Sequence, residues 1–305
     1  MALAVEVGRL TGENLPALTV EIDRARAAGE LRASADADAE YFLKSFAVDP
    51  TIVTGAFAGD ELIGFISPEF KAIAVRPDRR HQGVGRVLAG AAVDGERLRG
   101  RPDVILGVLP DDARGLAFLG ATGFAFHSTL WDLDLPHDSA VPEPIWPAGL
   151  IQRPFDRDRD VEPWIALFNV AFADHATPLQ LDASFIVAGL DDPAIVDDDT
   201  AIVEDEASGE LVAFCATSPI RRDGVVQPHG EIWTIGVRPD RQGAGLGRQL
   251  LRWGAGYLRS LGVPDVSLSV NGRNERALGL YESEGYVRGR TRERWARSTA
   301  TGIER

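Results

Sequence analysis

Apolar and polar residues follow the same succession of periodic patterns in the two halves of the chain, which indicates one structural unit repeated. Each half carries two strand-like regions, an amphipathic helical run, a further apolar strand and a short helix that ends at a Gly-aromatic pair. In the first half these patterns occupy 51–67, 69–75, 84–100, 103–109 and 119–124. In the second half they occupy 200–218, 231–237, 246–262, 265–271 and 281–286.

A fixed offset relates the two halves. The sequence VRPD begins at Val75 and again at Val237, a separation of 237 − 75 = 162 positions. The same offset relates Glu69 to Glu231, Gly85 to Gly247, Val104 to Val266 and Gly123 to Gly285. Chance does not keep such a register, so we predict a tandem duplication of one α/β domain. Two long copies do not make a solenoid, which stacks many short repeats.

A proline-rich stretch separates the two halves. Pro136, Pro142, Pro144 and Pro147 fall within 135–149, and this density of proline excludes a helix or a central strand. We therefore predict an N-terminal domain over 1–136, an extended linker over 137–149 and a C-terminal domain over 150–305. The fold class expected for each domain is α/β, with a central mixed sheet flanked by helices.

Composition and charge narrow the class of protein. The chain has 305 residues, of which 45% are hydrophobic and 26% charged, as in globular proteins with cores of ordinary size. The net charge of −14 argues against a nucleic-acid partner, because phosphate binding requires a basic surface. No apolar run reaches the roughly 18 residues of a membrane span, and the start, MALAVEVGRL, lacks a signal-peptide pattern. Cys215 is the single cysteine, so we expect a cytoplasmic protein without a disulfide or a membrane partner.

Each VRPD sequence continues into a glycine-punctuated loop between a strand and a helix, at 80–86 and 242–248. Glycines let backbone N–H groups at a helix start approach an anion, and we expect a pyrophosphate or a similar group. A tight turn without a ligand would explain one such loop, but two copies in register favour binding. The spacing of Gly243, Gly245 and Gly247 disfavours the dinucleotide fingerprint of nicotinamide-dependent oxidoreductases, and no Gly-Lys-Ser/Thr is present. Positive potential is expected from nearby arginines, namely Arg238, Arg241 and Arg248.

The pattern V-x-P-x-x-R/Q-x-x-G-x-G resembles the acetyl-CoA loop of the GNAT superfamily of N-acetyltransferases, and NERALGLYESEGY (274–286) looks like that family's second signature. The resemblance covers most of the chain as two tandem GNAT-like domains. It implies acetyl-CoA (CoA) as the cofactor and a sheet that opens between its fourth and fifth strands to admit the pantetheine arm. Asn274 would contact the arm or the adenosine-phosphate end. In the C-terminal copy the implied cofactor-binding residues are Ile235, Gly236, Val237, Gln242, Gly243, Ala244, Gly245, Leu246, Gly247, Arg248, Asn274 and Ala277. In the N-terminal copy they are Ile73, Ala74, Val75, Arg80, His81, Gln82, Gly83, Val84, Gly85 and Arg86.

Acetyl transfer to an amine needs a base, because an alkylammonium has a pKa near ~10, and it needs a proton for the leaving thiolate. Glu231 is the candidate general base, acting directly or through water, since it begins the strand that ends at Val237. Alternation places residues 231, 233, 235 and 237 on one face, so Trp233 is expected to line the acceptor cleft. The resemblance implies that Tyr281 is the general acid. A solvated Glu231 and a Tyr281 packed in the core are the structural alternatives.

The N-terminal copy lacks part of this catalytic set. At the offset of 162, Tyr281 corresponds to Leu119 and Asn274 corresponds to Asp112, whereas Glu69 is retained. Because leucine cannot donate a proton, we predict that the C-terminal domain is catalytic and that the N-terminal domain is a degenerate copy. The degenerate copy would still bind acetyl-CoA or would only shape the acceptor cleft.

The acceptor is the least determined part of the prediction. The stretch FADHATP (172–178) lies where the family builds its acceptor site, so Asp174 and His175 are candidate substrate-binding residues. The histidines show no metal-ligand spacing, and no metal is expected. We predict an N-acetyltransferase whose partner is a small-molecule amine: an amino sugar, an amino-thiol conjugate or an antibiotic. The alternative is a non-catalytic acyl-CoA-binding or regulatory protein. Acyl-chain preference and oligomeric state stay open, and a monomer is compatible with the sequence.

Overall fold

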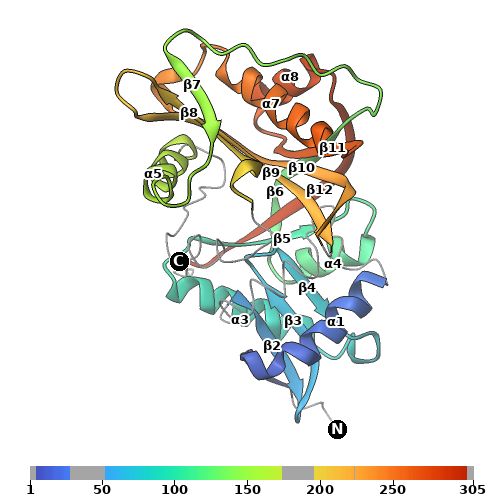
Figure 1. Cartoon of the computed structure of the whole chain (residues 1–305). Helices are drawn as coiled ribbons and strands as arrows, with labels where there is room; N and C mark the ends of the chain where they lie inside the picture. Colours follow the sequence, from blue (N-terminus) through green and yellow to red (C-terminus); the bar gives the residue numbers. More distant parts are fainter. Residues whose placement is uncertain (1–4, 28–51, 174–195, 223, 301–305) are drawn as a thin grey trace. The chain divides into compact units, whose positions relative to one another are not determined.

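The structure, a computed structural model of the chain, describes residues 5–27, 52–173, 196–222 and 224–300 (Figure 1). Its contacts divide the chain into two compact units. The N-terminal unit comprises residues 1–129 together with 291–305, and the C-terminal unit comprises residues 130–290. The chain therefore enters the C-terminal unit once and returns to the N-terminal unit at its end.

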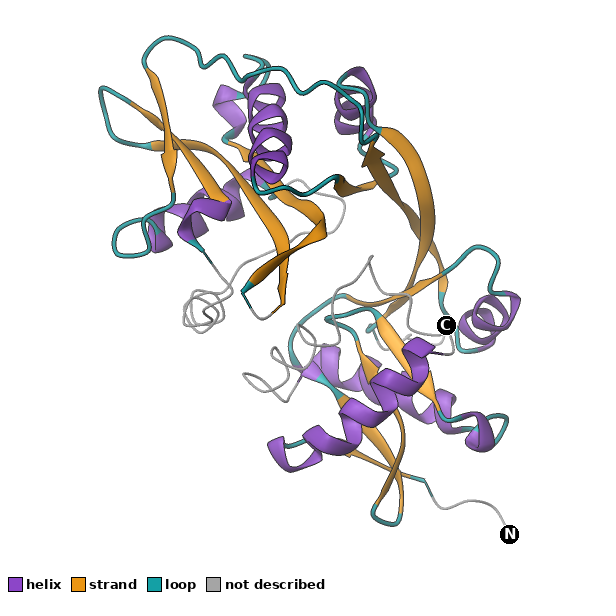
Figure 2. Ribbon diagram, turned by 45° about the vertical axis from the view of Figure 1, so that its right-hand side comes forward, coloured by secondary structure: helices purple, strands orange, loops and turns teal. Residues whose placement is uncertain are grey.

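The N-terminal unit has a four-stranded antiparallel sheet in the order β1-β2-β3-β4, with helices on both faces (Figures 1 and 2). Helix α1 packs on one face through Leu18 and Ile22, and α3 packs on the other through Leu88 and Val93. The strands are β1 (Glu6–Arg9), β2 (Thr54–Ala58), β3 (Glu61–Ser67), β4 (Ala72–Val75) and β5 (Asp103–Val108). The helices are α1 (Leu15–Ala27), α3 (Val84–Leu98) and α4 (Ala113–Ala121), with short 3₁₀ turns η1 (Gly12–Asn14) and η3 (Pro77–Arg79).

The C-terminal unit has a mixed sheet in which β10 and β11 are parallel and the other neighbours are antiparallel. Helices α7 and α8 cover one face, and α5 covers the other through a cluster of aromatic side chains (Figure 1). The strands are β7 (Leu150–Pro154), β8 (Thr200–Asp205), β9 (Leu211–Arg222), β10 (Val225–Val237) and β11 (Asp265–Asn271). The helices are α5 (Val161–Ala171), α7 (Leu246–Ser260) and α8 (Glu275–Ser283), with short turns η4 (Asp197–Asp199) and η5 (Pro239–Arg241).

Two long strands belong to both units. Strand β6 (Ala125–Leu135) begins in the N-terminal unit, and its second half pairs with β11 of the C-terminal unit from Leu130 to Leu135. Strand β12 (Val287–Ser298) begins in the C-terminal unit, and its second half pairs with β5 of the N-terminal unit from Glu293 to Ser298. The second half of the last strand in each sequence half thus belongs to the unit that the other half mainly forms.

The predicted α/β class with two GNAT-like copies is confirmed. Helices α3 and α7 begin at the predicted residues, whereas β10, α4 and α8 each begin six residues before the predicted patterns. The predicted patterns leave out β1, α1, β6, β7, α5 and β12. The unit boundaries differ from the predicted division at 136 and 150, because strand pairing joins β6 to the C-terminal sheet and β12 to β5. The folding of 1–136 and 150–305 as separate domains stays a prediction. Among the described residues, no helix is long and apolar enough to cross a membrane.

Residues 136–149 of the proline-rich stretch form no helix or strand, and they pack along α7 of the C-terminal unit. The backbone N–H of Ile145 donates to Gln249 Oε1 at 2.8 Å, and Arg259 Nη2 donates to the carbonyl of Pro136 at 3.0 Å. Val141 and Trp146 pack against the core under that helix. The linker is therefore part of the C-terminal unit.

Candidate active site

The glycine loop of the C-terminal unit has a backbone shape that exposes N–H groups. Gly243 and Gly245 have φ angles of 87° and 82°, in the left-handed region that favours glycine, and a side chain there would meet no neighbouring atom. Gly245 is the N-cap of α7, so the first N–H groups of this helix have no intrahelical acceptor. With the positive end of the helix dipole, they form a site for an anion. Gly247 lies deeper, and a Cβ on it would stand 3.5 Å from Leu280 of α8.

The loop of the N-terminal unit keeps this backbone path although its residues differ. His81 stands where Gly243 stands in the second copy, and it has a φ angle of 59° in the left-handed region. Gly83, the N-cap of α3, has a φ angle of 85°. Arg80 Nε donates to the carbonyl of Val75 at 3.0 Å, as Gln242 Nε2 does to Val237 at 3.2 Å. Gly85 matches Gly247, and a Cβ on it would stand only 2.8 Å from Phe118.

The arginines beside the C-terminal loop are engaged by carboxylates. Arg238 contacts Asp240 at 2.7 Å, Arg241 contacts Asp205 at 3.0 Å, and Arg248 contacts Glu284 at 3.2 Å. Each of these arginines, which were expected to add positive potential, has a carboxylate partner within the C-terminal unit that offsets its charge. Attraction for an anion at this loop therefore depends chiefly on the backbone N–H groups.

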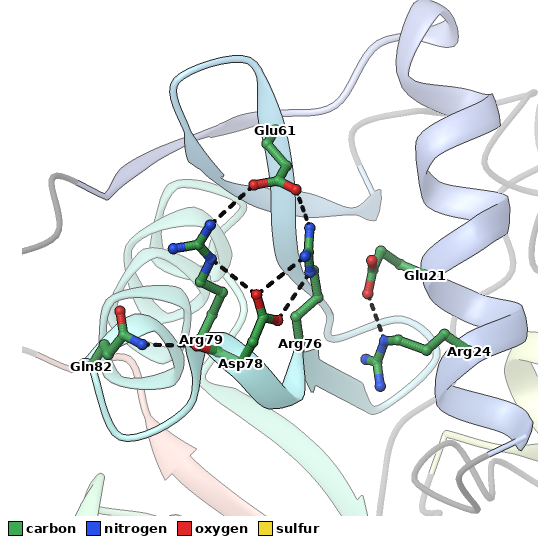
Figure 3. A network of polar contacts seen from close by, with 7 residues as sticks. All are labelled: Glu21, Arg24, Glu61, Arg76, Asp78, Arg79 and Gln82. Carbon is green, nitrogen blue, oxygen red and sulfur yellow. Dashed lines mark hydrogen bonds and ion pairs between the residues drawn. The ribbon is translucent and has the colours of Figure 1, made fainter.

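A similar network surrounds the N-terminal loop (Figure 3). Glu61 contacts both Arg76 and Arg79, and Asp78 accepts from Arg76 at 3.2 Å. Gln82 donates to the carbonyl of Asp78 at 2.9 Å, which fastens the loop to the turn η3. Arg86, in the first turn of α3, is exposed, whereas Val84, the first residue of this helix, is buried.

A cavity of about 500 Å³ adjoins the C-terminal loop. Ala244 and Leu246 line it from the loop, Arg241 and Asp205 line one wall, and the end of the linker at 147–150 lines another. The cavity is therefore shaped jointly by the loop and by the linker that packs along α7.

The C-terminal sheet opens between β10 and β11. Among the described residues, the parallel ladder covers His229–Ile232 of β10 and ends there. Beyond it, Ile235, Gly236 and Val237 pair on their other edge with β9. The corresponding residues of the N-terminal unit, Ile73, Ala74 and Val75, pair with β3, and β4 and β5 lie in different sheets. Both units thus have an open edge at the strand residues assigned to the pantetheine arm.

The candidate base Glu231 belongs to a row of polar side chains across three strands. Ser269 Oγ of β11 lies 2.8 Å from Asp132 Oδ1 of β6 and 3.3 Å from Glu231 Oε1 of β10. Asp132 is 8% exposed, whereas Glu231 is half-buried. The serine hydroxyl carries one proton, so it donates a hydrogen bond to only one of the two carboxylates at a time. Ser269 therefore lies between the side chains of Asp132 and Glu231 and links them.

A second polar row runs beside the first on the same strands. His229 Nε2 lies 3.3 Å from Ser267 Oγ, and Ser267 pairs in register with Asp134. Burial and the neighbouring Asp132 raise the pKa of Asp134, while His229 and Arg290 oppose that shift. The face of the sheet opposite α7 is therefore acidic around Glu231, and it suits a cationic substrate.

Trp233 lies on the Glu231 face, but Ile235 and Val237 do not. A register shift between Ile232 and Thr234 changes the face of the sheet to which the following side chains point, so Ile235 and Val237 pack on the α7 side. Trp233 is 49% exposed and stacks against Phe168 of α5, with ring centroids 6.5 Å apart. The expectation that all four alternate residues share one face is wrong, because a β-bulge interrupts the alternation.

The candidate acid Tyr281 is half-buried on α8. Its ring packs against the core under α7 and lies 6.2 Å from the ring of Tyr286. Burial raises the pKa of Tyr281 to about 12, so the phenol keeps its proton at neutral pH. The matching residue of the N-terminal unit, Leu119, is buried in the core and offers no proton.

Asn274 begins α8 as its N-cap. Its Oδ1 accepts from the N–H of Ala277 at 3.1 Å, and its Nδ2 group is the donor that a contact with a phosphate would use. Asp112 caps α4 in the same way, accepting from Gly115 at 2.9 Å. Asn274 and Asp112 are different residues, but both act as the N-cap of their helix.

Glu69, the counterpart of Glu231, has different neighbours. Its carboxylate contacts Arg101 at 3.2 Å, and its carbonyl accepts from Lys71 Nζ at 3.0 Å. Position 107, which corresponds to Ser269, is a glycine. The N-terminal unit thus keeps the glutamate but lacks the serine and carboxylate beside it.

Two predicted acceptor-binding residues, Asp174 and His175, lie outside the described residues. Sequence reasoning missed Asp132 and Ser269. The alternation WDLDL at 131–135 places both aspartates on one face of a strand, but its pairing with β11 joins sequence positions more than a hundred residues apart.

Comparison with known proteins places these features in a family. Residues 161–286 match the model of the acetyltransferase (GNAT) family. The chain is 34% identical over 242 residues to a mycothiol acetyltransferase of Thermobispora bispora, covering 76% of this chain and 79% of that protein. It is 35% identical over 217 residues to one of Thermomonospora curvata, covering 71% and 69%.

Solved structures agree in fold. A GCN5-related N-acetyltransferase from Sphaerobacter thermophilus superposes with a TM-score of 0.65 at 20% identity, covering 98% of this chain and 97% of that one. A tandem GNAT protein from the clavulanic acid biosynthesis pathway gives a TM-score of 0.68 at 18% identity, covering 98% and 100%.

Proposed function

The chain belongs to the GNAT family of acetyltransferases, and we propose that its C-terminal unit moves an acetyl group from acetyl-CoA to the amine of a small molecule. The observation that carries this proposal is the position of Glu231. It lies where β10 and β11 part, in one row with Ser269 and Asp132. The tandem layout also resembles that of mycothiol synthase.

The fit of acetyl-CoA to the C-terminal unit is supported by two features. The left-handed Gly243 and Gly245 leave open space at the start of α7, where N–H groups would hold the pyrophosphate. The unpaired edge of Ile235–Val237 would bind the pantetheine arm as an added strand binds a sheet. These residues supply binding and orientation, and the thioester supplies the reactive acyl group.

Glu231 would act on the amine as the general base, and Tyr281 would act on the leaving sulfur as the general acid. Glu231 accepts a proton from the ammonium, directly or through water, and the neutral amine then adds to the thioester carbonyl. As the carbon–sulfur bond breaks, the phenol of Tyr281 donates its proton to the sulfur, and the proton that the nitrogen loses on becoming an amide returns to the phenolate. A backbone N–H near Val237 would stabilise the carbonyl oxygen. The pKa of Tyr281, raised to about 12, means that the phenol is in its protonated form at neutral pH.

The amine class of the acceptor is supported by the charge of the cleft. Asp132, Asp134 and Glu231 lie on one face, and Trp233 offers an exposed ring beside them. Carboxylates and an aromatic face both attract an ammonium group. Because the relatives are named mycothiol acetyltransferases, an amino sugar–cysteine conjugate heads the acceptors to test, followed by other amino sugars and antibiotics.

A non-catalytic acyl-CoA-binding protein is the second candidate, favoured by one observation. The N-terminal unit has Leu119 where Tyr281 stands, so one half of this chain has the loop without the acid. For that unit, binding without turnover is the function we propose. For the C-terminal unit, the presence of Glu231, Ser269 and Tyr281 favours the enzyme.

The test is release of CoA from acetyl-CoA with a panel of amines, comparing Tyr281→Phe with Tyr286→Phe. We expect kcat to fall by about 10- to 1,000-fold for Tyr281→Phe, with the KM for acetyl-CoA unchanged. Tyr286 is the matched control, because its buried hydroxyl has no hydrogen-bond partner among the residues that the structure describes and lies in the same cluster. Full activity of Tyr281→Phe would exclude the acid role, and binding without turnover by any amine would favour the second candidate.

A further inference from the structure

An arginine lies in the first turn of each of the four helices that follow or pack against the two glycine loops. In the C-terminal unit, Arg248 is the third residue of α7 and Arg276 is the second residue of α8. In the N-terminal unit, Arg86 and Arg114 occupy the same places in α3 and α4. Since 248 − 86 = 162 and 276 − 114 = 162, both pairs match at the offset of the duplication. The first-turn arginines are therefore a shared feature of the two copies.

A cation in the first turn is unfavourable for the helix itself. The N-terminal end of a helix carries the positive end of the helix dipole, so acidic side chains stabilise it and basic side chains destabilise it. Helices α3, α4 and α7 nevertheless have no acidic residue in the first turn, and α8 has Glu275 beside its arginine. Residues that oppose local stability in both copies point to a role in binding, and a bound anion would offset this unfavourable charge.

Arg276 reaches from α8 to the glycine loop of the C-terminal unit. It is exposed, and its Nη1 donates to Gln242 Oε1 at 3.1 Å. Gln242 Nε2 in turn donates to the carbonyl of Val237 at 3.2 Å. Because Gln242 immediately precedes Gly243, these contacts hold the guanidinium beside the start of the loop.

The charge of Arg276 is not offset in the way that the charge of Arg248 is. Arg248 contacts Glu284 at 3.2 Å, and the arginines at the two ends of the turn η5 also contact carboxylates. Arg276 contacts an uncharged amide, and within the described ranges no carboxylate contacts its guanidinium. Its counterpart Arg114, also exposed, has no side-chain hydrogen bond or ion pair in the part of the chain that the structure describes. Arg276 is therefore suited to bind an anion next to the loop.

We propose that Arg276 binds the 3′-phosphate of CoA, an inference that rests on the proposed use of acetyl-CoA by the C-terminal unit. The N–H groups at the start of α7 are assigned to the pyrophosphate, and the 3′-phosphate adds about two further negative charges at neutral pH. A guanidinium can bind such a group through two parallel hydrogen bonds. Arg276 is then a specificity-determining residue, because it distinguishes CoA from dephospho-CoA, which lacks the 3′-phosphate.

The experiment is calorimetric titration of the full chain with CoA and with dephospho-CoA. We expect a wild-type site that binds CoA about 10-fold or more tightly than dephospho-CoA, because a charge-assisted hydrogen bond contributes a factor of this order. Arg276→Gln should bind the two ligands with nearly equal affinity at that site, and its affinity for dephospho-CoA should equal that of wild type.

Two matched variants remove the same charge elsewhere. Arg288→Gln acts within the C-terminal unit on a side chain that contacts Glu282 and the ring of Trp131, and it should keep the preference for CoA. Arg114→Gln acts in the N-terminal unit, and it should leave unchanged the site that Arg276→Gln alters.

Salt dependence gives a second readout that a folding defect would not mimic. Salt screens an exposed ion pair, so the loss of CoA affinity in Arg276→Gln should shrink as the salt concentration rises. Absence of CoA binding by the wild type would contradict the proposed function itself. If the wild type binds CoA, then no loss of affinity in Arg276→Gln, or an equal loss for CoA and dephospho-CoA, would overturn the 3′-phosphate assignment alone.

Discussion

At the scale of single residues, the two units differ in charge at one matching position of their strand pairing. Asp132 and Arg294 occupy matching places on exchanged strands, so an aspartate lies opposite Ser269 in one unit and an arginine lies opposite Gly107 in the other. Glu231 contacts Ser269, whereas Glu69 contacts Arg101. The same backbone therefore presents an acidic face in one unit and a basic face in the other.

Asp132→Asn tests how the buried carboxylate acts on the acidic face around Glu231. A neighbouring negative charge raises the pKa of a carboxyl group, and Asp132 raises the pKa of Asp134 in this way, so its removal should lower the pKa of Asp134. The acid limb of kcat/KM should then move to lower pH by about one unit or less, and the KM for the amine should rise. Asp138→Asn, which changes the same charge at an exposed position, should leave the profile unchanged. An acid limb that stays in place in Asp132→Asn would contradict this role.

At the scale of elements, loops and caps are repeated more faithfully than the residues that form them. His81 adopts the left-handed conformation that Gly243 adopts in the other copy, although that conformation costs a non-glycine residue about 1 kcal/mol. Arg80 and Gln242 donate to matching strand carbonyls, and Asp112 and Asn274 cap matching helices.

The cap of α8 can be separated from a ligand contact by two substitutions of Asn274. Asn274→Ala should lower the free energy of unfolding by about 1 kcal/mol, because it removes the acceptor of the Ala277 N–H. Asn274→Asp should keep that stability, as Asp112 caps α4. Thermal unfolding measures both. Equal destabilisation by Ala and Asp would contradict the capping role, and a weaker Kd for acetyl-CoA in a stable Asn274→Asp would indicate a contact with the phosphates.

The sequence predicts the elements well and the pairing of distant strands poorly. The glycine loops, the helices behind them and Glu231 follow from local periodicity and from the fixed offset. The bulge at Trp233 does not, because it depends on how β9 and β10 pair. The contact between Asp132 and Ser269 was not predicted either, because it joins β6 and β11 across the sequence halves.

At the scale of the whole molecule, the exchanged strands make each unit depend on the other half of the sequence. The β6–β11 ladder extends over Leu130–Leu135, and Asp132 reaches Ser269 only through it. Without β6, β11 loses an antiparallel neighbour and becomes an exposed edge. The boundary between the two units lies within β6, before the proline-rich stretch, because the second half of β6 pairs with β11.

Fragments of the C-terminal unit test this dependence. We expect 130–290 to unfold cooperatively, because it retains the part of β6 that pairs with β11 and the linker along α7. Fragment 150–290 lacks both and should unfold at a much lower temperature or aggregate. Circular dichroism during heating distinguishes them. Equal unfolding temperatures for the two fragments would show that β6 is dispensable and would favour the division at 150.

The assignment of catalysis to the C-terminal unit is tested most directly by matched substitutions of the two glutamates. Acetyl transfer from acetyl-CoA to an accepted amine should be measured for Glu231→Gln and Glu69→Gln in the full chain. We predict that Glu231→Gln lowers kcat/KM by about 100-fold or more, with the Kd for acetyl-CoA unchanged, and that Glu69→Gln retains wild-type activity. Loss of activity in Glu69→Gln with full activity in Glu231→Gln would contradict the assignment and place the reaction in the N-terminal unit.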